Sequence, residues 1–576
     1  MNWKQWVRAE APPSGEIRRL AVQLSQKGPF PEVLAQILLQ RGVTDLAEAS
    51  RFFRPAAADL HDPFLMQDMD RAADRMLRAL QQQEMILLYG DYDVDGTSAV
   101  TLMTLALGEL GFRTCYYLPD RYTEGYGVSY RGIDYAESQG AALILSLDCG
   151  IKSADKVGYA ARKGIDFIVC DHHTPGEALP PALAVLDPRR PDCLYPYKEL
   201  TGCGVGFKLL QAISIRMRGA GLPVPENFDP FTAYCDLITL SIACDIVPIT
   251  GENRTIAWHG LQKLRSNPLP GIQALMNQAR EPRTWDISDL VFFIGPRINA
   301  AGRLYHASHA VEVLLGHSLE LDGLAESLHT SNEERKTLDR QMTEEALALI
   351  GQDPGYAARS TTVLYHPEWH KGVIGIVASR LIEQHYRPTV LLTRSDGKLV
   401  GSARSVAGFD LYAALDACTE HLIQFGGHKY AAGLSLWEDQ LDAFRSRFDA
   451  VVSGTIEAAQ RSPVLQIDAQ VSLRSVDERL AGMLSRMEPF GPENLRPVFE
   501  AQGLDVVRSQ IMKDEHLRLT LDEQGARMDA VAFGMAAQWE RLGKPERIDI
   551  AFQPVLSTWN QQTRIELRLK DLRPSA

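Results

Sequence analysis

The chain has 576 residues, 45% hydrophobic and 23% charged, which is typical of globular proteins and long enough for roughly three or four domains. Its formal net charge of −13 argues against a uniformly basic nucleic-acid binder but leaves room for a local cationic site. No apolar run is long enough to span a bilayer, and the first twenty residues lack the apolar centre of a secretory signal, so we expect a cytoplasmic protein without a membrane segment.

Residues 85 to about 190 alternate short apolar runs with helical stretches. This alternation predicts βαβ units and a mostly parallel sheet. Several of the apolar runs, among them "MILLYG", "AALILSL" and "DFIVC", end directly before an aspartate. Because ligands bind at the carboxyl ends of parallel strands, these acids are candidates for one shared site.

The sequence pattern changes twice in the rest of the chain. Residues 200 to 350 look helical, with "FTAYCDLITLSIACDIVP" as a buried helix and a long charged helix near 324–351 that lacks an evident apolar partner. A second α/β pattern runs to about 455, and short alternating strands after 461 predict a small barrel of the OB type. The aromatic residues of that module are candidates either for base stacking or for its core: Phe499, Phe533, Trp539, Phe552 and Trp559.

The stretch "DYDVDG" at residues 91–96 opens like a calcium-binding EF-hand loop. Such a loop needs a bidentate glutamate at its twelfth position, where this chain has Leu102, and a helix before it, where "MILLYG" is typical of a strand. We therefore expect another reason for these acids.

Four clusters of acids and imidazoles stand at predicted element ends. Converging carboxylates repel one another strongly at low local dielectric unless a cation neutralises them, so the clusters predict a metal site. No cysteine has ligand spacing, and oxygen ligands mixed with imidazole favour Mn²⁺ or Mg²⁺, with two ions suited to phosphoester hydrolysis. The clusters comprise Asp91, Asp93 and Asp95; Asp148; Asp171, His172 and His173; and Asp245.

Further along, several stretches could hold an anionic strand. "TVLLTRSDGKLVGSARS" predicts a hairpin with Asp396 and Gly397 in the turn, and its second strand places Ser402 and Arg404 on one face, where they suit a terminal phosphate. "HKGVIGIVASR" could begin an anion-binding helix. The remaining candidates in this group are Arg297, Asn299, Arg303, His370, Gly426, Gly427 and His428, with salt bridges and tight packing as the competing interpretations.

Taken together, these segments resemble the DHH phosphoesterase superfamily. "LLYGDYDVDGTSA", "SLDCG", "VCDHHTPG" and "ACDIVP" are similar to its four successive motifs, while "FIGPRINAAGRL", "WHKGVIGIVASR", "GSARS" and "FGGHKYAAG" are similar to further motifs of its RecJ branch. The resemblance covers nearly the whole chain, in order.

The resemblance implies a multidomain α/β fold. A parallel-sheet DHH domain is joined by a long helix to a second α/β domain of the DHHA1 type, and an all-β OB-type domain follows. The corresponding limits are 1–80 for an N-terminal segment packed on the DHH domain, 81–320 for the DHH domain, 321–355 for the helix, 356–458 for the DHHA1 domain and 459–576 for the OB domain.

The resemblance also implies roles. One ion would be held by Asp93 and Asp148 with Asp91 nearby, and the other by Asp95, Asp148, His172 and Asp245, so that Asp148 bridges. His173 would face the scissile phosphate, with Asp171 orienting a histidine. Many superfamily members have a histidine where this chain has Tyr89, so we expect Asp91 to substitute for it.

By resemblance, the chain is a single-strand-specific DNA exonuclease that degrades 5′ to 3′ to mononucleotides in recombination and repair. The implied partners are single-stranded DNA, single-strand-binding protein and a repair helicase, and we expect a monomer. Three alternatives stay open: a phosphodiesterase for oligonucleotides or cyclic dinucleotides, a non-catalytic DNA-binding scaffold, and an inorganic pyrophosphatase.

Overall fold

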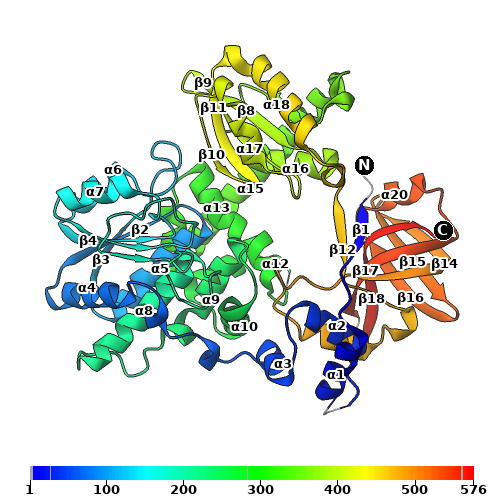
Figure 1. Ribbon diagram of the computed structural model, residues 1–576, viewed down its shortest axis with the longest axis horizontal. Coiled ribbons are helices and arrows are strands. Elements are labelled where there is room, and N and C mark those ends of the chain that lie inside the picture. Colours follow the sequence, from blue (N-terminus) through cyan, green and yellow to red (C-terminus); the bar gives the residue numbers. More distant parts are fainter. Residues whose placement is uncertain (1–3, 26–27, 282, 560–561, 576) are drawn as a thin grey trace.

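Three separately packed units share the chain in the computed structural model, which describes residues 4–25, 28–281, 283–559 and 562–575. Figure 1 shows the first unit at the left, the second at the top and the third at the right, beside the N-terminal helices. Among the described residues, no helix combines the length and apolar character needed to cross a membrane.

The first unit is built on a five-stranded parallel sheet, as the sequence predicts. Its strands lie in the order β3-β2-β4-β5-β6. The strands are nearly continuously apolar because helices cover both faces of the sheet. The elements are α4 (Met69–Gln81), β2 (Met85–Gly90), α5 (Val94–Glu109), β3 (Arg113–Tyr117), α6 (Tyr130–Ser138), β4 (Ala141–Leu147), α7 (Ala154–Arg162), β5 (Asp166–Cys170) and β6 (Ala184–Leu186).

A helical layer completes this unit and includes the buried helix that the sequence predicts. Helix α9 packs between α5, α8 and α10, and its Leu237, Ile238 and Leu240 are fully buried. The helices are α8 (Gly202–Gly219), α9 (Pro230–Cys244), α10 (Gly251–Ser266), α11 (Pro270–Met276), α12 (Ile287–Asp289), α13 (Gly295–Leu304) and α14 (Ser308–Leu315).

The long helix α15 (Leu321–Gln352) joins the first unit to the second. The sequence shows no evident apolar partner for it, but the structure supplies two. Near its start, Ala325 and Leu328 belong to the core of the first unit, whereas Met342 and Ala346 pack against α16 of the second. Helix α15 therefore packs into the cores of both units and is not a solvated spacer.

The second unit is a five-stranded sheet with helices. The predicted hairpin is present, with Asp396 (φ 52°) and Gly397 (φ 75°) in the left-handed turn between β8 and β9. Strand order is β10-β11-β9-β8-β7. The elements are β7 (Thr362–Tyr365), α16 (Ile374–His385), β8 (Thr389–Ser395), β9 (Lys398–Arg404), α17 (Leu411–Asp416), β10 (Gln424–His428), β11 (Ala431–Leu436) and α18 (Leu441–Thr455).

The third unit is the predicted barrel. Strand β14 pairs with both β15 and β17, which closes the sheet in the order β14-β15-β16-β18-β17. The elements are β12 (Val464–Ile467), β13 (Ala469–Gln470), α19 (Glu478–Ser485), β14 (Phe499–Met512), β15 (His516–Glu523), β16 (Ala526–Ala532), α20 (Ala536–Arg541), β17 (Arg547–Trp559) and β18 (Gln562–Pro574).

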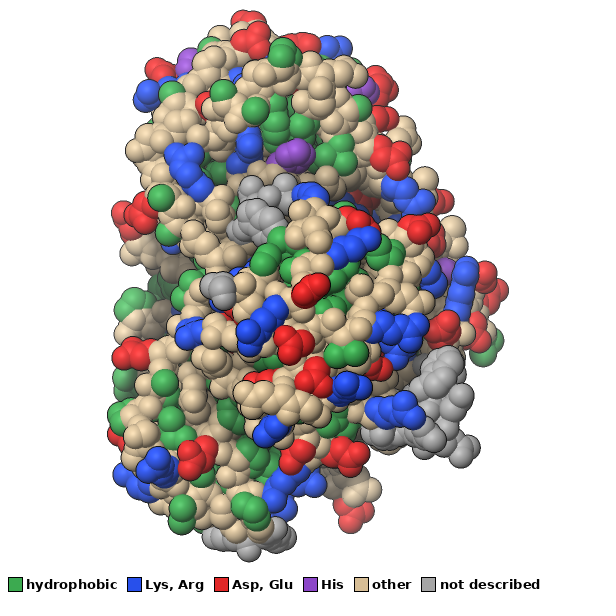
Figure 2. All heavy atoms as spheres, turned by 90° about the vertical axis from the view of Figure 1, so that its right-hand side faces the viewer, with side chains coloured by type: hydrophobic (Ala, Val, Ile, Leu, Met, Phe, Trp, Pro, Cys, Tyr) green, Lys and Arg blue, Asp and Glu red, His purple; other side chains and the backbone are tan. Residues whose placement is uncertain are grey.

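Most aromatic side chains of the barrel belong to its core. Phe499, Trp539 and Phe552 are buried, whereas Phe533 is 59% exposed; the side chain of Trp559 lies outside the described residues. Figure 2 shows acidic and basic side chains mixed over the face that includes the barrel. Base stacking on the barrel therefore has one candidate, Phe533, among the four described side chains.

The N-terminal segment differs from our expectation that residues 1–80 pack on the first unit. Strand β1 (Gln5–Arg8) pairs with β12 in parallel, and Trp6 donates to Asp571 at 2.8 Å. Leu20 and Leu34 of the following helices belong to the hydrophobic core of the barrel. The helices are α1 (Ser14–Leu24), α2 (Glu32–Gln40) and α3 (Leu46–Phe53), and only the later α4 packs beneath the parallel sheet.

One arginine joins the first unit to the N-terminal helices and to the chain before β14. The guanidinium of Arg254 on α10 lies 3.8 Å from the ring centroid of Phe52. It also donates to the carbonyl oxygens of Phe52 (2.8 Å), Glu488 (3.0 Å) and Pro489 (3.2 Å). Arg254 stacks on one partner and donates to several carbonyl oxygens. It therefore holds α10, the N-terminal helices and the chain before β14 together more firmly than a single ion pair would.

Deleting residues 1–9 is expected to increase hydrogen–deuterium exchange of the β12 amides, because β12 loses its pairing with β1. Exchange in β8 and β9 of the second unit is the internal control and should not change. Unchanged protection of residues 464–467 would show that β1 does not stabilise β12.

Candidate metal centre and nucleic-acid interface

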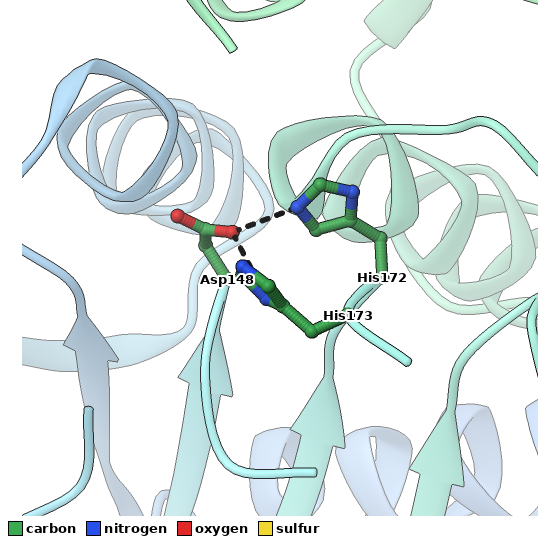
Figure 3. A group of neighbouring side chains, drawn as sticks. All are labelled: Asp148, His172 and His173. Carbon is green, nitrogen blue, oxygen red and sulfur yellow. Dashed lines mark ion pairs between the residues drawn. The ribbon is translucent and has the colours of Figure 1, made fainter. Parts of the chain in front are cut away.

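The candidate site lies at the carboxyl edge of the parallel sheet, where strand ends bring distant residues together. Asp91 follows β2, Asp148 follows β4, and Asp171 follows β5 with two histidines behind it. Asp245 caps the end of α9 on the opposite side. Figure 3 shows one carboxylate oxygen of Asp148 directed at the rings of His172 and His173.

The six expected metal ligands fall into two adjoining groups. In the first, oxygens of Asp91, Asp93 and Asp148 lie within 4.8 Å of one another, and in the second the ligand atoms of Asp95, His172 and Asp245 do. The groups meet where Asp148 Oδ1 is 3.2 Å from His172 Nε2. This arrangement suits two cations that share Asp148.

Unpaired buried atoms support a cation site. Asp91 Oδ2, Asp148 Oδ1 and both ring nitrogens of His172 are buried without a hydrogen-bond partner, which is costly unless something else binds them. Burial, and then the charge of Asp95, raises the pKa of Asp148 well above its usual range; burial also raises the pKa of Asp91. Carboxylates with an imidazole fit Mn²⁺ or Mg²⁺.

Backbone amides at the start of α8 hold Asp95. Its carboxylate accepts hydrogen bonds from the amides of Gly202 (2.7 Å) and Cys203 (2.9 Å) and from the hydroxyl of Ser241 (2.7 Å). The start of α8 also lies against Asp148, which requires glycine at position 202, because a Cβ there would lie 2.5 Å from the Cβ of Asp148. A helix N-terminus favours the charged carboxylate and fixes its direction.

A second acid orients His173. Its Nδ1 lies 2.8 Å from Asp171 Oδ1, and Asp171 Oδ2 also accepts the amide of Ile151. Burial alone would raise the pKa of Asp171 and lower that of His173. Their pairing outweighs burial, so the pKa of Asp171 falls to about 2 and that of His173 rises to about 9. Asp171 therefore both orients the His173 ring and favours its protonated form. The hydroxyl of Tyr126 lies 3.1 Å from its Nε2.

Tyr89 bonds the loop that follows β3. Its hydroxyl donates to the carbonyl oxygen of Gly127 at 3.1 Å and accepts the amide of Ser129 at 3.0 Å. Asp91 follows the same strand and lies in the group with Asp93 and Asp148. The structure thus places a carboxylate, and not the Tyr89 side chain, beside the first metal position.

In the second unit, Ser402 and Arg404 share one face of β9, as predicted. Arg404 Nη1 donates to Ser402 Oγ at 2.9 Å. The first turn of α16 packs closely on this pair, because a Cβ on Gly375 would lie 2.7 Å from Arg404 Nη2 and 2.8 Å from Ser402 Oγ. A helix start next to a hydroxyl and a guanidinium is suited to an anion.

Two further guanidinium groups converge on Arg404. Burial, and then the charges of Arg121, Arg335 and Arg404, lowers the pKa of Arg303 to about 10. Arg303 Nη1 donates to the carbonyl oxygen of Gly372 at 3.0 Å, which ties the first unit to the loop before α16. Arg335 is paired with Asp339 at 3.8 Å, whereas Arg121, Arg303 and Arg404 have no ion pair with any described acid. These three neighbouring cations predict that an anion binds among them.

The other predicted strand-binding residues differ in their surroundings. Arg297 stacks 3.5 Å from the ring centroid of Phe293 and bonds His329 at 2.9 Å, which supports a structural role. Asn299 is half-buried on α13, and His370 accepts the amide of Gly372 at 3.1 Å.

The edge strand β10 carries the last three candidates: Gly426, Gly427 and His428. Burial, and then the charges of Lys152 and His173, lowers the pKa of His428, so the second unit approaches the metal cluster through this strand. At Gly427 (φ 149°) a Cβ would meet the carbonyl oxygen of Ala431 at 2.4 Å, which demands glycine.

Sequence reasoning missed Arg121 and Tyr126. Both lie in the loop after β3, which ends at the same edge of the sheet as the other strands. Their position at a strand's carboxyl end was the available signal.

Comparison with known proteins identifies the family. Three family models match in order: the DHH family N-terminal domain at residues 85–242, the DHHA1 domain at 358–454 and the RecJ OB domain at 467–571. The single-stranded-DNA-specific exonuclease RecJ of Dickeya dadantii is 34% identical over 574 residues, covering 97% of this chain and 98% of that protein. The chain belongs to the RecJ family.

Other RecJ proteins agree. RecJ of Bacillus subtilis, also named as a single-stranded-DNA-specific exonuclease, is 32% identical over 578 residues, covering 99% of this chain and 70% of that protein. The crystal structure of Thermus thermophilus RecJ in complex with Mn²⁺ superposes with a TM-score of 0.83 at 28% identity, covering 99% of this chain and 80% of that one. The DHH, DHHA1 and OB order that the sequence predicts is thereby confirmed.

Adding Mn²⁺ to the chelator-treated protein is expected to raise its melting temperature by about 5 °C or more, since binding to the folded state alone stabilises it. In the Asp148→Asn variant this rise should be largely lost. Without metal, the same variant should melt higher than the wild type, because one repelling carboxylate is gone. Differential scanning fluorimetry measures both effects, with Asp514→Asn in the barrel as a control; equal Mn²⁺ responses would contradict the assignment.

Proposed function

We propose that this RecJ-family protein is a single-stranded-DNA-specific exonuclease that hydrolyses phosphodiester bonds with Mn²⁺ or Mg²⁺. The observation that carries the proposal is the meeting of two ligand groups at Asp148, next to a His173 that Asp171 orients. Two bound ions would activate the attacking water and stabilise the charge that develops on the oxygens at phosphorus.

The protein's own residues then orient the phosphate. His173 Nδ1 stays bonded to Asp171. When the ring is protonated, its Nε2 can donate to a phosphate oxygen or to the departing 3′ oxygen. Tyr126, next to that nitrogen, can donate to the same phosphate once the strand displaces its contact with His173. Buried acids fixed by backbone amides need little rearrangement during the reaction, which favours catalysis.

We further propose a 5′ to 3′ direction with mononucleotide products, set by a pocket for the 5′ phosphate. Arg121 and Arg303 of the first unit and Arg404 with Ser402 of the second would bind the terminal phosphate. A terminus held at a fixed distance from Asp148 allows only one bond to reach the metals. His428 and the glycines of β10 would let the strand backbone pass close to the second unit.

The cellular context is also a proposal. Eight free cysteines suit a reducing compartment such as the cytoplasm. Work in recombination and repair, as a monomer beside a helicase and single-strand-binding protein, follows from family resemblance, as do the limits 81–320, 321–355, 356–458 and 459–576.

On single-stranded DNA labelled at its 5′ end, the protein with Mn²⁺ is expected to release labelled mononucleotide from the first turnover, and blunt duplex should be cut far more slowly. Chelator or Asp148→Asn should lower the rate by about a thousandfold, because the shared ligand is lost. Asp514→Asn is the control. Equal rates on single-stranded and blunt duplex DNA would refute the strand specificity.

The terminal pocket predicts that a 5′-phosphorylated strand is cut faster than the same strand ending in a 5′ hydroxyl. Arg404→Gln should lower kcat/KM on the phosphorylated strand by about tenfold and abolish this preference, since a charge-assisted contact is removed. Arg394→Gln, in the same hairpin but paired with Glu438, should keep it. A preference that survives Arg404→Gln would place the terminus elsewhere.

A further inference from the structure

Ile246, directly after the candidate ligand Asp245, has an unfavourable backbone conformation. Helix α9 ends at Cys244 with Asp245 as its cap, so Ile246 occupies the position that usually carries glycine. Its φ is 59°, in the left-handed region, where the branched Cβ of isoleucine meets the backbone.

Burial of the Ile246 side chain contributes little to the stability of the fold. The side chain is 64% exposed, so burial does not offset the strain. Among the described residues, nine other non-glycine positions have a φ of 51° to 65°, and all nine are Asp, Gln, Glu or Lys. Ile246 is the apolar exception, and it stands beside the metal cluster.

The cluster is open to solvent on this side. The side chains of Asp95, Asp148 and His172 are 0%, 2% and 6% exposed, whereas those of Asp245 and His173 are 24% and 31% exposed. Asp93 is partly exposed as well. A phosphodiester can therefore approach across the side that Asp93, Asp245 and His173 line. A nucleotide placed there would lie next to Ile246.

We propose that Ile246 is an apolar contact for the nucleobase that flanks the scissile phosphate. This inference rests on the proposed function and deepens it. Every base has an apolar face, so the contact is independent of sequence. In a duplex that face is stacked and cannot lie on a side chain, so the same contact favours an unpaired strand.

The test uses the full-length protein with Ile246→Gly, Ile246→Leu and a matched control, Gln83→Gly. Gln83 is also a left-handed residue (φ 52°) just after a helix, α4, but it precedes β2 at the far end of the sheet from Asp91. Both glycine variants should raise the melting temperature by about 2 °C, because glycine removes the strain. Loss of stability in Ile246→Gly alone would show that the side chain supports the fold and would overturn the inference.

Binding and cleavage of single-stranded oligonucleotides show whether Ile246 contacts the strand or acts through Asp245. Ile246→Gly should raise KM, and Kd measured by fluorescence anisotropy in chelator, by about tenfold with little change in kcat. Ile246→Leu should stay near wild type, Gln83→Gly should not differ from it, and the Mn²⁺-induced rise in melting temperature should persist in Ile246→Gly. Loss of that rise would mean that the substitution acts through Asp245, which would overturn the inference.

Abasic substrates identify the contacted group. Oligonucleotides lacking the base at the first or the second position from the 5′ end should bind the wild type about tenfold more weakly at one of these positions. At that position, removing the base should weaken binding by Ile246→Gly no further, because the variant already lacks the side chain that contacts this base. Additive losses at both positions would overturn the inference. A wild type that binds with this coupling but does not cleave would instead refute the proposed function.

Discussion

Electrostatic repulsion among buried carboxylates is the constraint on which the site depends. Asp91, Asp93, Asp95, Asp148 and Asp245 approach one another where water is largely excluded, and burial raises the pKa of Asp148 and Asp245 far above normal. A fold tolerates such an arrangement only if rigid elements hold it. Here the parallel sheet supplies three strand ends, and the start of α8 supplies amide donors for Asp95.

Helix α15 extends this rigidity to the second unit. It packs on α13 in the first unit and on α16 in the second, and α16 begins beside Arg404 and Ser402. Because Arg303 also donates to the loop before α16, the guanidinium cluster spans the boundary between the units. The distance between that cluster and the metal ligands is thus set by packed helices and not by a flexible linker.

Much of the site could be predicted from the sequence, because strand ends and motif spacing are local properties. The positions of Asp148, His172 and Asp245 followed from apolar runs that end in acids. Arg297 and Arg303 stand in one motif, but six residues along a helix turn them to different faces, and the structure places only Arg303 in the cationic cluster. Packing partners of amphipathic helices are not local, which explains why the docking of α1–α3 was not foreseen.

That docking has a consequence for how the chain is made. Leu34 in α2 shares its core with Leu473 and with barrel strands, so more than 430 residues must leave the ribosome before this helix meets its partners. At elongation rates of about 5 to 20 residues per second the delay is roughly 20 to 90 seconds. Throughout that interval an apolar helical hairpin is solvent-exposed, and the nascent protein depends on chaperones or on transient burial to escape aggregation.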